Sequence, residues 1–304
     1  MYDFDDLPDW ALRFNFTAHS ASGSARPTCK EMFEKAVARP QRLFDRAGCP
    51  AIAGRACETF AKAIVIEGMD AGQAYRSAVS TFDEHEVLDH IDGDRAKFSI
   101  IRDDVYEVPG TDPRVSGSVL ELTCRHTAAG LVEATRGVNK VEDGRWISAR
   151  LDDVELDFIG QIDVEAGGVV EIKTRWPYIS DRAKRGWTIN SLPAKPDPNH
   201  VCQVALYWLW LRQQSENVPV KLVYANCKGY RVFTSADCEQ LSEAALNEAL
   251  ERLRTIARAR EQMMQKAQNI GELLAMIAPD FTHYMWKSVS PEYRAAADKA
   301  WRTK

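Results

Sequence analysis

The sequence lacks three features that would assign its class directly. No apolar run approaches the roughly 20 residues that cross a bilayer, so we expect no membrane partner. The first residues, MYDFDDLPDW, have neither the basic segment nor the apolar stretch of a signal peptide, which makes the cytoplasm the expected location. The seven cysteines form no C-x-x-C pair and are widely scattered, which argues against a disulfide framework or a compact zinc site.

The chain also lacks an excess of positive charge. Its 39 lysine and arginine residues are outnumbered by 44 aspartate and glutamate residues, giving a net charge of −5. A strongly basic protein would indicate nucleic-acid binding directly, so here such binding requires a local basic patch. The 304 residues, 45% hydrophobic and 27% charged, are otherwise typical of a globular protein with a large core.

Residue spacing predicts helices in the first part of the chain. Asp112 before Pro113 is typical of a helix start, and Gly130 is typical of a helix end. The first 130 residues are therefore expected to be mainly helical. Apolar residues recur at helical spacing in 29–45, 51–68 and 71–91.

Strand-like spacing replaces the helical period after residue 130. The segment 131–138 is a short strand candidate, and 146–164 alternates between apolar and polar residues with an expected bulge at 152–153. A tight turn at 166–168 leads into VVEIKT (169–174), a β-branched run that suits a central strand. The remaining expected elements are a helix at 200–214, strands at 219–227 and 230–235, a long helix capped by Thr234 or Ser235 and ending near Ala267, and shorter final helices, one starting at Ser290–Pro291.

This order of elements predicts a mixed α/β fold. Helices, a β-meander, one helix, two strands and further helices follow one another, which is typical of a central mixed sheet covered by helices. No repeat or flexible linker marks a boundary within the chain. We therefore expect a single domain over 1–304, with a core at about 50–235, a helical N-terminal part at 1–130 and a helical C-terminal part at 236–304.

The segment IGQIDVEAGGVVEIKTR contains the residues with the clearest chemistry. Asp163 ends one strand, while Glu171 and Lys173 lie two apart on the next; period 2 puts this pair on one face, and hairpin pairing can bring Asp163 beside it. Two carboxylates at one point suit Mg²⁺, which binds through one or two carboxylates together with phosphates and water. A neighbouring lysine can orient and help to deprotonate a water molecule while the metal stabilises charge on a phosphate. The alternative is a surface ion pair of Glu171 with Lys173 on an exposed strand.

These residues resemble a known nuclease signature. Asp163, Glu171 and Lys173 are similar to the (D/E)-x(n)-E-x-K pattern of the PD-(D/E)XK nuclease superfamily. The run from Gly160 to Asp163 resembles the G-x-[IV]-D of its RecB-like members, in the branch with Cas4-like and phage exonucleases. The resemblance covers roughly residues 50–235 and implies a restriction-endonuclease-like core.

A second motif lies on the following helix. Gln203-Val-Ala-Leu-Tyr207 resembles the Q-x-x-x-Y of the same branch, and i,i+4 spacing puts both side chains on one helical face. By resemblance, Gln203 contacts the attacking water or the scissile phosphate, and Tyr207 supports the DNA strand. The alternative for Gln203 is a core glutamine bonded to backbone groups. The resemblance also implies that Mg²⁺ or Mn²⁺ is held by Asp163, Glu171 and the backbone carbonyl of Ile172.

Two upstream glutamates match the family less closely. Gly54-Arg-Ala-Cys-Glu58 lies where RecB-like proteins have G-x-x-x-H, so the resemblance implies a metal ligand at Glu58; a solvated helix face is the alternative. Glu133 resembles a glutamate on the first core strand of the family, near the metal rather than on it. Some members hold an iron–sulfur cluster through a close trio of downstream cysteines. The downstream cysteines here, at 202, 227 and 238, are too dispersed, so no cluster is expected.

A local basic patch lies within residues 174–200. Its five basic residues outnumber Asp181 and Asp197, and three aromatic residues are interleaved with them. Basic residues neutralise phosphates, and aromatic faces stack on unpaired bases; a long loop in a compact domain is also often functional. The alternative is a polar loop whose aromatic residues pack on the protein body. The predicted DNA-binding residues are Arg175, Trp176, Tyr178, Arg182, Lys184, Arg185, Trp187 and Lys195.

Together these features predict a metal-dependent DNA exonuclease. The RecB-like motifs favour action on DNA ends or single strands, in recombination, repair or phage DNA metabolism. No Walker G-x-x-x-x-G-K-[ST] motif is present, which fits a stand-alone nuclease whose partners are DNA and a replication or recombination protein. The alternatives are a structure-specific or restriction-like endonuclease on the same core, and a catalytically silent DNA-binding scaffold.

Overall fold

The computed structural model describes most of the chain. No helix within the described residues is long and apolar enough to span a membrane. The described ranges are 7–23, 26–43, 49–86, 101–108, 116–180, 182–215, 217–287 and 289–302.

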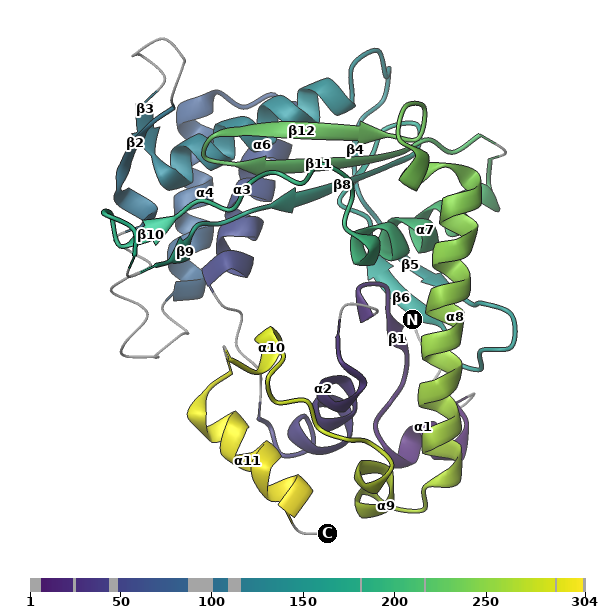
Figure 1. The fold of residues 1–304 in the computed structure, drawn as a ribbon. Coiled ribbons are helices and arrows are strands. Elements are labelled where there is room, and N and C mark those ends of the chain that lie inside the picture. Colours follow the sequence, from purple (N-terminus) through teal and green to yellow (C-terminus); the bar gives the residue numbers. More distant parts are fainter. Residues whose placement is uncertain are drawn as a thin grey trace.

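A five-stranded sheet, the central sheet of the larger body, lies in the upper part of Figure 1. Two of its strands are parallel neighbours, and its other neighbouring pairs are antiparallel, so the sheet is mixed. With helices on both sides, this confirms the predicted mixed α/β class. In sheet order the strands are β12 (Gly229–Thr234), β11 (Val220–Asn226), β8 (Val169–Thr174), β7 (Val164–Glu165) and β4 (Glu142–Asp143), with β8 and β11 parallel.

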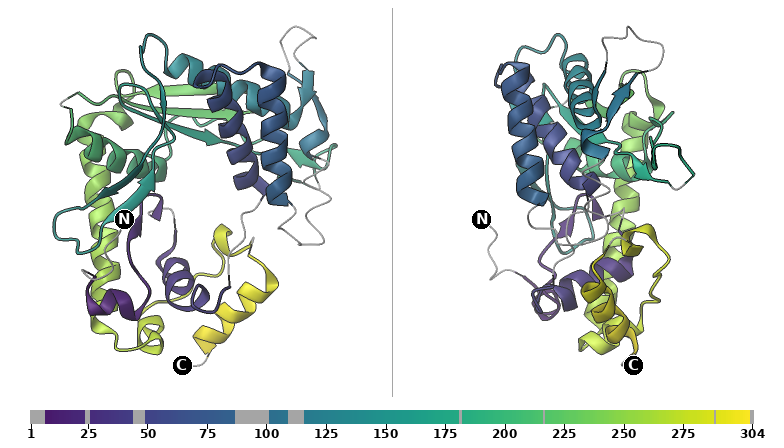
Figure 2. Two further views of the ribbon diagram at one scale, coloured as in Figure 1. Left: turned by 180° about the vertical axis from the view of Figure 1, so that it is seen from behind. Right: turned by 90° about the vertical axis from the view of Figure 1, so that its left-hand side faces the viewer.

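Helices cover both faces of this sheet. On one face, seen in front of the sheet on the left of Figure 2, α6 (Val119–Ala134) packs on β11 and β12. On the same face, α3 (Cys49–Val65) packs on α6 and β8, and α4 (Ala71–Glu86) packs on α3. The other face is covered by α7 (Pro198–Arg212) and α8 (Glu243–Lys266), which pack on one another.

Alternation along β8 sorts its side chains between these two layers. Val170 and Ile172 join the buried cluster formed with α3 and α6, whereas Val169 joins the cluster formed with α7 and α8. Period 2 then places Glu171 and Lys173 on the α7 face. Since helices cover both faces, the strand is rich in β-branched residues, as the sequence predicts.

Three shorter sheets surround the central one. The largest pairs a strand near the N-terminus with a hairpin that leads into the candidate site. It consists of β1 (His19–Ser20), β6 (Phe158–Gln161) and β5 (Trp146–Ala149), and the two-stranded ribbons are β2 (Val105–Glu107) with β3 (Ser116–Ser118) and β9 (Tyr178–Ile179) with β10 (Trp187–Thr188).

A second, smaller body of helices lies away from the central sheet, at the bottom of Figure 1. It combines residues from both ends of the chain around an aromatic cluster that includes Phe33, Trp286 and Trp301. Its helices are α1 (Asp9–Arg13), α2 (Thr28–Phe33), which continues as a π-helix over Glu34–Ala38, α9 (Ile270–Ala275), α10 (Tyr284–Lys287) and α11 (Pro291–Arg302).

The long helix α8 joins the two bodies (Figure 1). Its first part packs against α7, and Met264 near its end lies in the aromatic cluster of the second body. Glu261 is buried at this junction and accepts hydrogen bonds from the backbone N–H groups of Glu155 at 3.0 Å and Leu156 at 2.9 Å. The same carboxylate lies 3.1 Å from Nε2 of His19 on β1. Glu261 therefore ties α8, β1 and the β5–β6 connection together.

The course of α6 corrects two predictions. The helix runs through Gly130 to Ala134, so Gly130 does not end it and the strand predicted at 131–138 is wrong. A Cβ at Gly130 would lie 2.6 Å from Cγ1 of Val223, so the glycine lets the helix approach the sheet. Glu133 consequently lies on an exposed helix face, where it accepts a hydrogen bond from Tyr230, and not on a core strand.

Serine residues cap the starts of α6 and α8. Ser118 caps α6, accepting from the backbone N–H of Glu121 at 3.1 Å; the start predicted at Asp112–Pro113 lies outside the described residues, as do 87–91 of the predicted 71–91 helix. Ser242, not Thr234 or Ser235, caps α8.

The segment 146–164 forms two paired strands rather than one bulged strand. β5 and β6 pair antiparallel, with Ala149 opposite Phe158. The chain reverses between them, where Asp153 adopts a φ of 59°. The strands predicted from the alternation of apolar and polar residues are therefore confirmed, but Asp152 and Asp153 form a turn and not a bulge.

Gly130→Ala tests the close contact between α6 and the sheet. Overpacking a tight contact costs about 1–3 kcal/mol, and alanine returns up to about 1 kcal/mol through helix propensity. We expect the free energy of unfolding, measured by urea denaturation, to fall by about 1–2 kcal/mol. Gly229→Ala is the matched control, because a Cβ there meets nothing within 4 Å; equal stabilities for the two variants would contradict the packing argument.

Candidate active site

Asp163, Glu171 and Lys173 lie together on the sheet face covered by α7. β7 and β8 pair antiparallel, and their register, continued by one pair, places Asp163 opposite Glu171. The backbone N–H of Ile172 donates to Asp163 Oδ2 at 2.7 Å, which holds this carboxylate against β8. Lys173 Nζ donates to Glu171 Oε1 at 2.5 Å. Two carboxylates and one ammonium thus share a single small space.

Burial controls the electrostatics of this space. Glu171 is only 1% exposed, and its Oε2 has no hydrogen-bond partner among the described residues. Burial, followed by the charges of Glu171 and Glu58, raises the pKa of Asp163 well above its usual value. Burial also raises the pKa of Glu171, although Lys173 opposes this shift. Adjacent carboxylates with raised pKa values favour a shared proton or a cation between them.

Lys173 is the one cation in direct contact with these carboxylates among the described residues. Burial alone would lower the pKa of Lys173, but the charges of Glu171 and Asp163 raise it above its usual value. The side chain is therefore an ammonium ion at neutral pH. It is suited to orient a water molecule and to stabilise negative charge, rather than to accept a proton.

Helix α7 brings Gln203 and Tyr207 to the carboxylates. Gln203 Nε2 donates to Tyr207 Oη at 3.0 Å, and burial followed by the charge of Glu171 raises the pKa of Tyr207. Tyr207 is only 1% exposed, so its position suits orienting Gln203 and does not offer a face to a DNA strand. A Cβ at Gly160 would lie 2.8 Å from Tyr207 Cε1. The glycine of the motif ending at Asp163 therefore lets α7 close over β6.

Helix α3 places Glu58 at the edge of the site. Gly54, one turn earlier, packs close to the end of β8, where a Cβ would lie 3.2 Å from Thr174 Oγ1. Glu58 Oε1 lies 2.5 Å from Lys62 Nζ, and this lysine also pairs with Asp143 at 2.7 Å. The charge of Glu58 helps to raise the pKa values of the two central carboxylates, so it is close to them while bonded elsewhere.

The donor set fits a hard cation held by few protein ligands. Within the described ranges, no three His, Cys, Asp or Glu side chains converge in a metal-binding group. The side-chain ligands on offer are thus Asp163 and Glu171, which is enough for Mg²⁺ because this ion keeps several waters and takes phosphate oxygens. Glu171 Oε2 is the buried, unpartnered oxygen that a cation would satisfy.

Only part of the predicted DNA-binding patch is exposed. Trp176 and Trp187 are buried in the cluster formed with α3, α4 and α6. Trp176 contacts the ring of Phe82 on α4, and Trp187 Nε1 donates to Asp104 Oδ2 at 2.8 Å. These two indoles therefore anchor the loop and are not available for stacking on bases. Tyr178 is 51% exposed, and Arg175 is half-buried. The exposed basic residues of the patch are Arg182, Lys184, Arg185 and Lys195, of which Arg185 donates to the Val105 carbonyl at 2.9 Å.

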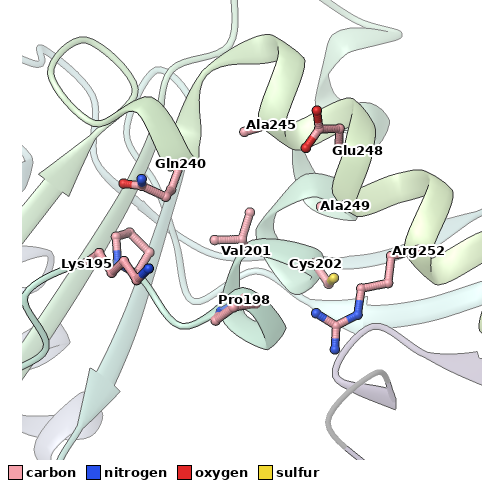
Figure 3. A pocket seen from close by; sticks show the side chains of 10 residues that line it. Lys195, Pro198, Val201, Cys202, Gln240, Ala245, Glu248, Ala249 and Arg252 are labelled. Atoms are coloured by element: carbon pink, nitrogen blue, oxygen red, sulfur yellow. The ribbon is translucent and has the colours of Figure 1, made fainter.

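Lys195 lies on the rim of a pocket of about 280 Å³ between α7 and α8 (Figure 3). Figure 3 shows Arg252, from α8, on the other side of Pro198. Arg252 Nη2 donates to Asn199 Oδ1 at 3.3 Å, and the floor of the pocket includes the buried Cys202. No spacing in the sequence indicates that Arg252 of α8 meets the basic loop.

The sequence analysis also missed His200 and Tyr224. Tyr224 is the register partner of Lys173 on the neighbouring strand, so its phenol lies on the same sheet face. Its Oη accepts a hydrogen bond from the backbone N–H of Asp197 at 3.1 Å and lies 2.8 Å from His200 Nδ1. A histidine three residues before Gln203 is a signal that the helical period could have provided, but Tyr224 reads as an ordinary strand aromatic.

Comparison with known proteins adds little to this geometry. No family model matches the chain, and no curated protein matches its sequence. Among solved structures, the fold is similar to the crystal structure of a "Putative exonuclease" from Eubacterium rectale, with a TM-score of 0.46 and 11% identity over 94% of this chain and 92% of that chain. A similarity at this level assigns neither a family nor an activity, so the function is argued from the site.

Proposed function

We propose that this protein is a metal-dependent deoxyribonuclease with its active site at Asp163, Glu171 and Lys173. The observation that carries the proposal is the buried carboxylate pair, with one unpartnered oxygen and a lysine ammonium beside it. Burying two carboxylates is costly unless cations compensate their charge, and one lysine compensates only one of them. A divalent ion that also binds a phosphate fits this imbalance. The resemblance of the sequence to PD-(D/E)XK nucleases supports the same assignment.

Each residue of the site has a role in this proposal. Asp163, Glu171 and the backbone carbonyl of Ile172 would hold Mg²⁺ or Mn²⁺, and the ion would supply positive charge for the phosphate and the attacking water. Lys173, as an ammonium ion, orients the attacking water and stabilises the charge that develops on the phosphate. Gln203, oriented by its bond to the phenol of the next turn, donates to the water or to a phosphate oxygen.

The exposed part of the loop between β8 and α7 supplies the DNA contacts. Its basic side chains neutralise phosphates, and Tyr178 stacks on an unpaired base. Trp176 and Trp187 contribute by anchoring the loop, because both are buried. Glu58 joins a second metal only when it leaves Lys62. The basic side chains are Arg175, Arg182, Lys184, Arg185 and Lys195.

The RecB-like motifs favour an exonuclease among the possible modes of cleavage. Its substrates would be single strands or duplex ends in recombination, repair or phage DNA metabolism in the cytoplasm, together with a replication or recombination protein as partner. A structure-specific or restriction-like endonuclease uses the same core, and a silent DNA-binding scaffold keeps the fold without cleavage.

Linear and closed circular DNA, each with Mg²⁺ or with EDTA, separate these three functions. We expect end-labelled linear DNA to be degraded in Mg²⁺ while circles stay intact, and the label also reports the direction of digestion. Nicked circles would instead indicate an endonuclease, and binding without cleavage would indicate a scaffold. An absence of both binding and cleavage would refute the proposal.

Lys173→Ala tests the role of the ammonium. We expect cleavage of linear DNA to fall by roughly two to three orders of magnitude, because a group that stabilises transition-state charge is lost, while DNA binding measured by fluorescence anisotropy is largely kept. Lys221→Ala is the matched control: Lys221 lies on the adjacent β11 and donates to the Ala134 carbonyl at the end of α6. A wild-type cleavage rate in Lys173→Ala would falsify the assignment.

Asp163→Asn tests the buried carboxylate pair without measuring activity. The Asp163 carboxyl keeps its proton to higher pH in the folded protein than in the unfolded chain. The free energy of unfolding of the wild type in EDTA should therefore fall as pH rises from about 4, the ordinary aspartate pKa, to the raised pKa of the folded protein. Asparagine removes this loss and is expected to stabilise the metal-free protein at pH 7.

Metal addition should make the wild type more stable than Asp163→Asn, which reverses the order of stability in EDTA. Mg²⁺ or Mn²⁺ at 100 times its Kd stabilises a folded protein by about 2.7 kcal/mol, so the wild-type Tm should rise by several degrees and the Asp163→Asn Tm should not. Differential scanning fluorimetry measures both effects. Equal metal-induced shifts in the two proteins would place the metal elsewhere.

A further inference from the structure

A histidine with one bonded ring nitrogen lies next to the proposed site. His200 is in the first turn of α7 and is half-buried. Its Nδ1 lies 2.8 Å from Tyr224 Oη, and the two rings are in contact with centroids 5.6 Å apart. The other nitrogen, Nε2, is bonded to no described residue. His200 therefore keeps one polar atom for a ligand.

The surroundings of Tyr224 assign the proton on this ring. Tyr224 Oη already accepts a hydrogen bond from the backbone N–H of Asp197 at 3.1 Å. The phenol hydrogen is then free to donate, and Nδ1 of His200 is the acceptor in reach. With Nδ1 as acceptor, a neutral imidazole carries its hydrogen on Nε2. His200 thus presents an N–H donor.

The charges facing His200 favour this neutral form. Burial, followed by the charge of Lys173, lowers the pKa of His200 to about 4; Arg175 acts in the same direction, and Asp197 opposes them. Tyr224 stays protonated, because burial raises its pKa to about 12. Lys173 and Arg175 therefore create a positive region at a neutral donor, which is an environment suited to an oxygen of a phosphodiester.

We infer that His200 is a DNA-binding residue whose Nε2–H donates to a phosphate oxygen of the strand in the active site. This inference rests on the proposed nuclease function, and it adds a contact that the sequence motifs do not include. Tyr224 is a positioning residue in this arrangement, because it fixes the ring through Nδ1. The contact stabilises substrate and transition state alike, so it affects KM more than kcat.

Two conservative variants separate a phosphate contact from a structural role. The amide of asparagine reaches the position of Nδ1, so His200→Asn can keep the bond to Tyr224 and lose the contact at Nε2. The amide of glutamine reaches the position of Nε2, so His200→Gln can keep the phosphate contact. Rescue by glutamine and not by asparagine is the signature of the inferred role.

The experiment measures kcat and KM of the full-length protein with Mg²⁺ on an end-labelled single strand. We expect His200→Ala and His200→Asn to raise KM about ten-fold, equivalent to about 1.4 kcal/mol of binding, with kcat changed less than about two-fold. His200→Gln should stay within about three-fold of the wild-type KM. Wild-type KM in His200→Ala, or rescue by asparagine alone, would overturn the inference.

His126→Ala is the matched control for removal of a half-buried histidine. Its Nδ1 is also bonded, lying 2.9 Å from the Asn226 carbonyl, but it lies on α6, which covers the other sheet face. We expect wild-type kcat and KM from this variant. A KM increase matching that of His200→Ala would show that the effect comes from lost packing, and it would overturn the inference.

A chemical change on the DNA gives a second readout. Neutral methylphosphonates are introduced one position at a time, and binding is measured by anisotropy in EDTA. At one position the substitution should weaken wild-type binding more than binding by His200→Ala, because part of the loss is the contact that the variant already lacks. Additive effects at every position would exclude a direct contact.

The pH dependence of KM tests whether His200 binds the phosphate as a neutral donor. The KM ratio of His200→Ala to wild type should stay constant from pH 6 to 8.5, since the ring is neutral throughout this range. A ratio that falls as pH rises would mean that the ring binds as a cation. If the wild-type protein neither binds nor cleaves DNA, the nuclease proposal and this inference fail together; a cleaving wild type with an unaffected His200→Ala refutes this inference alone.

Discussion

The burial of two carboxylates beside a single ammonium is the constraint around which the site is arranged. Asp163 is held by a backbone N–H of β8, Glu171 by Lys173, and one carboxylate oxygen keeps no partner among the described residues. Helix α7 encloses this charge through Tyr207, and the missing side chain at Gly160 permits the approach. Enclosure removes the water that would otherwise solvate the carboxylates, so a cation entering the space gains more than it would at a surface.

The parts of this arrangement that depend on short-range geometry could be predicted from the sequence. A tight turn between two strand segments determines the pairing of β7 with β8, and period 2 then puts Glu171 and Lys173 on one face. Helical spacing likewise placed Gln203 and Tyr207 together. The mixed α/β class followed from the order of elements. The strand and helix pairings need only a few consecutive residues, and the fold class needs only the order of elements, so tertiary packing did not override them.

Features that depend on packing between distant segments could not be predicted. Trp176 and Trp187 alternate with basic residues as in a DNA-binding loop, yet both are buried, in ring contact with Phe82 of α4 and Tyr106 of β2 respectively. The run after Gly130 is β-branched enough to suggest a strand, but contact with β11 keeps it helical. His200 gains its significance only from Tyr224, on a strand that follows much later in the chain. No local pattern contains these contacts.

The junction at Glu261 has a consequence for how the protein is made. Helix α8 covers α7, and Glu261 binds backbone groups of the β5–β6 connection and the ring of His19. A ribosome delivers the strands of the sheet well before residue 261, so a nascent chain exposes the apolar face of α7 until α8 follows. The candidate site and α7 are therefore translated well before the helix that covers α7, and a chain that stops short of α8 would leave the apolar face of α7 exposed and aggregation-prone.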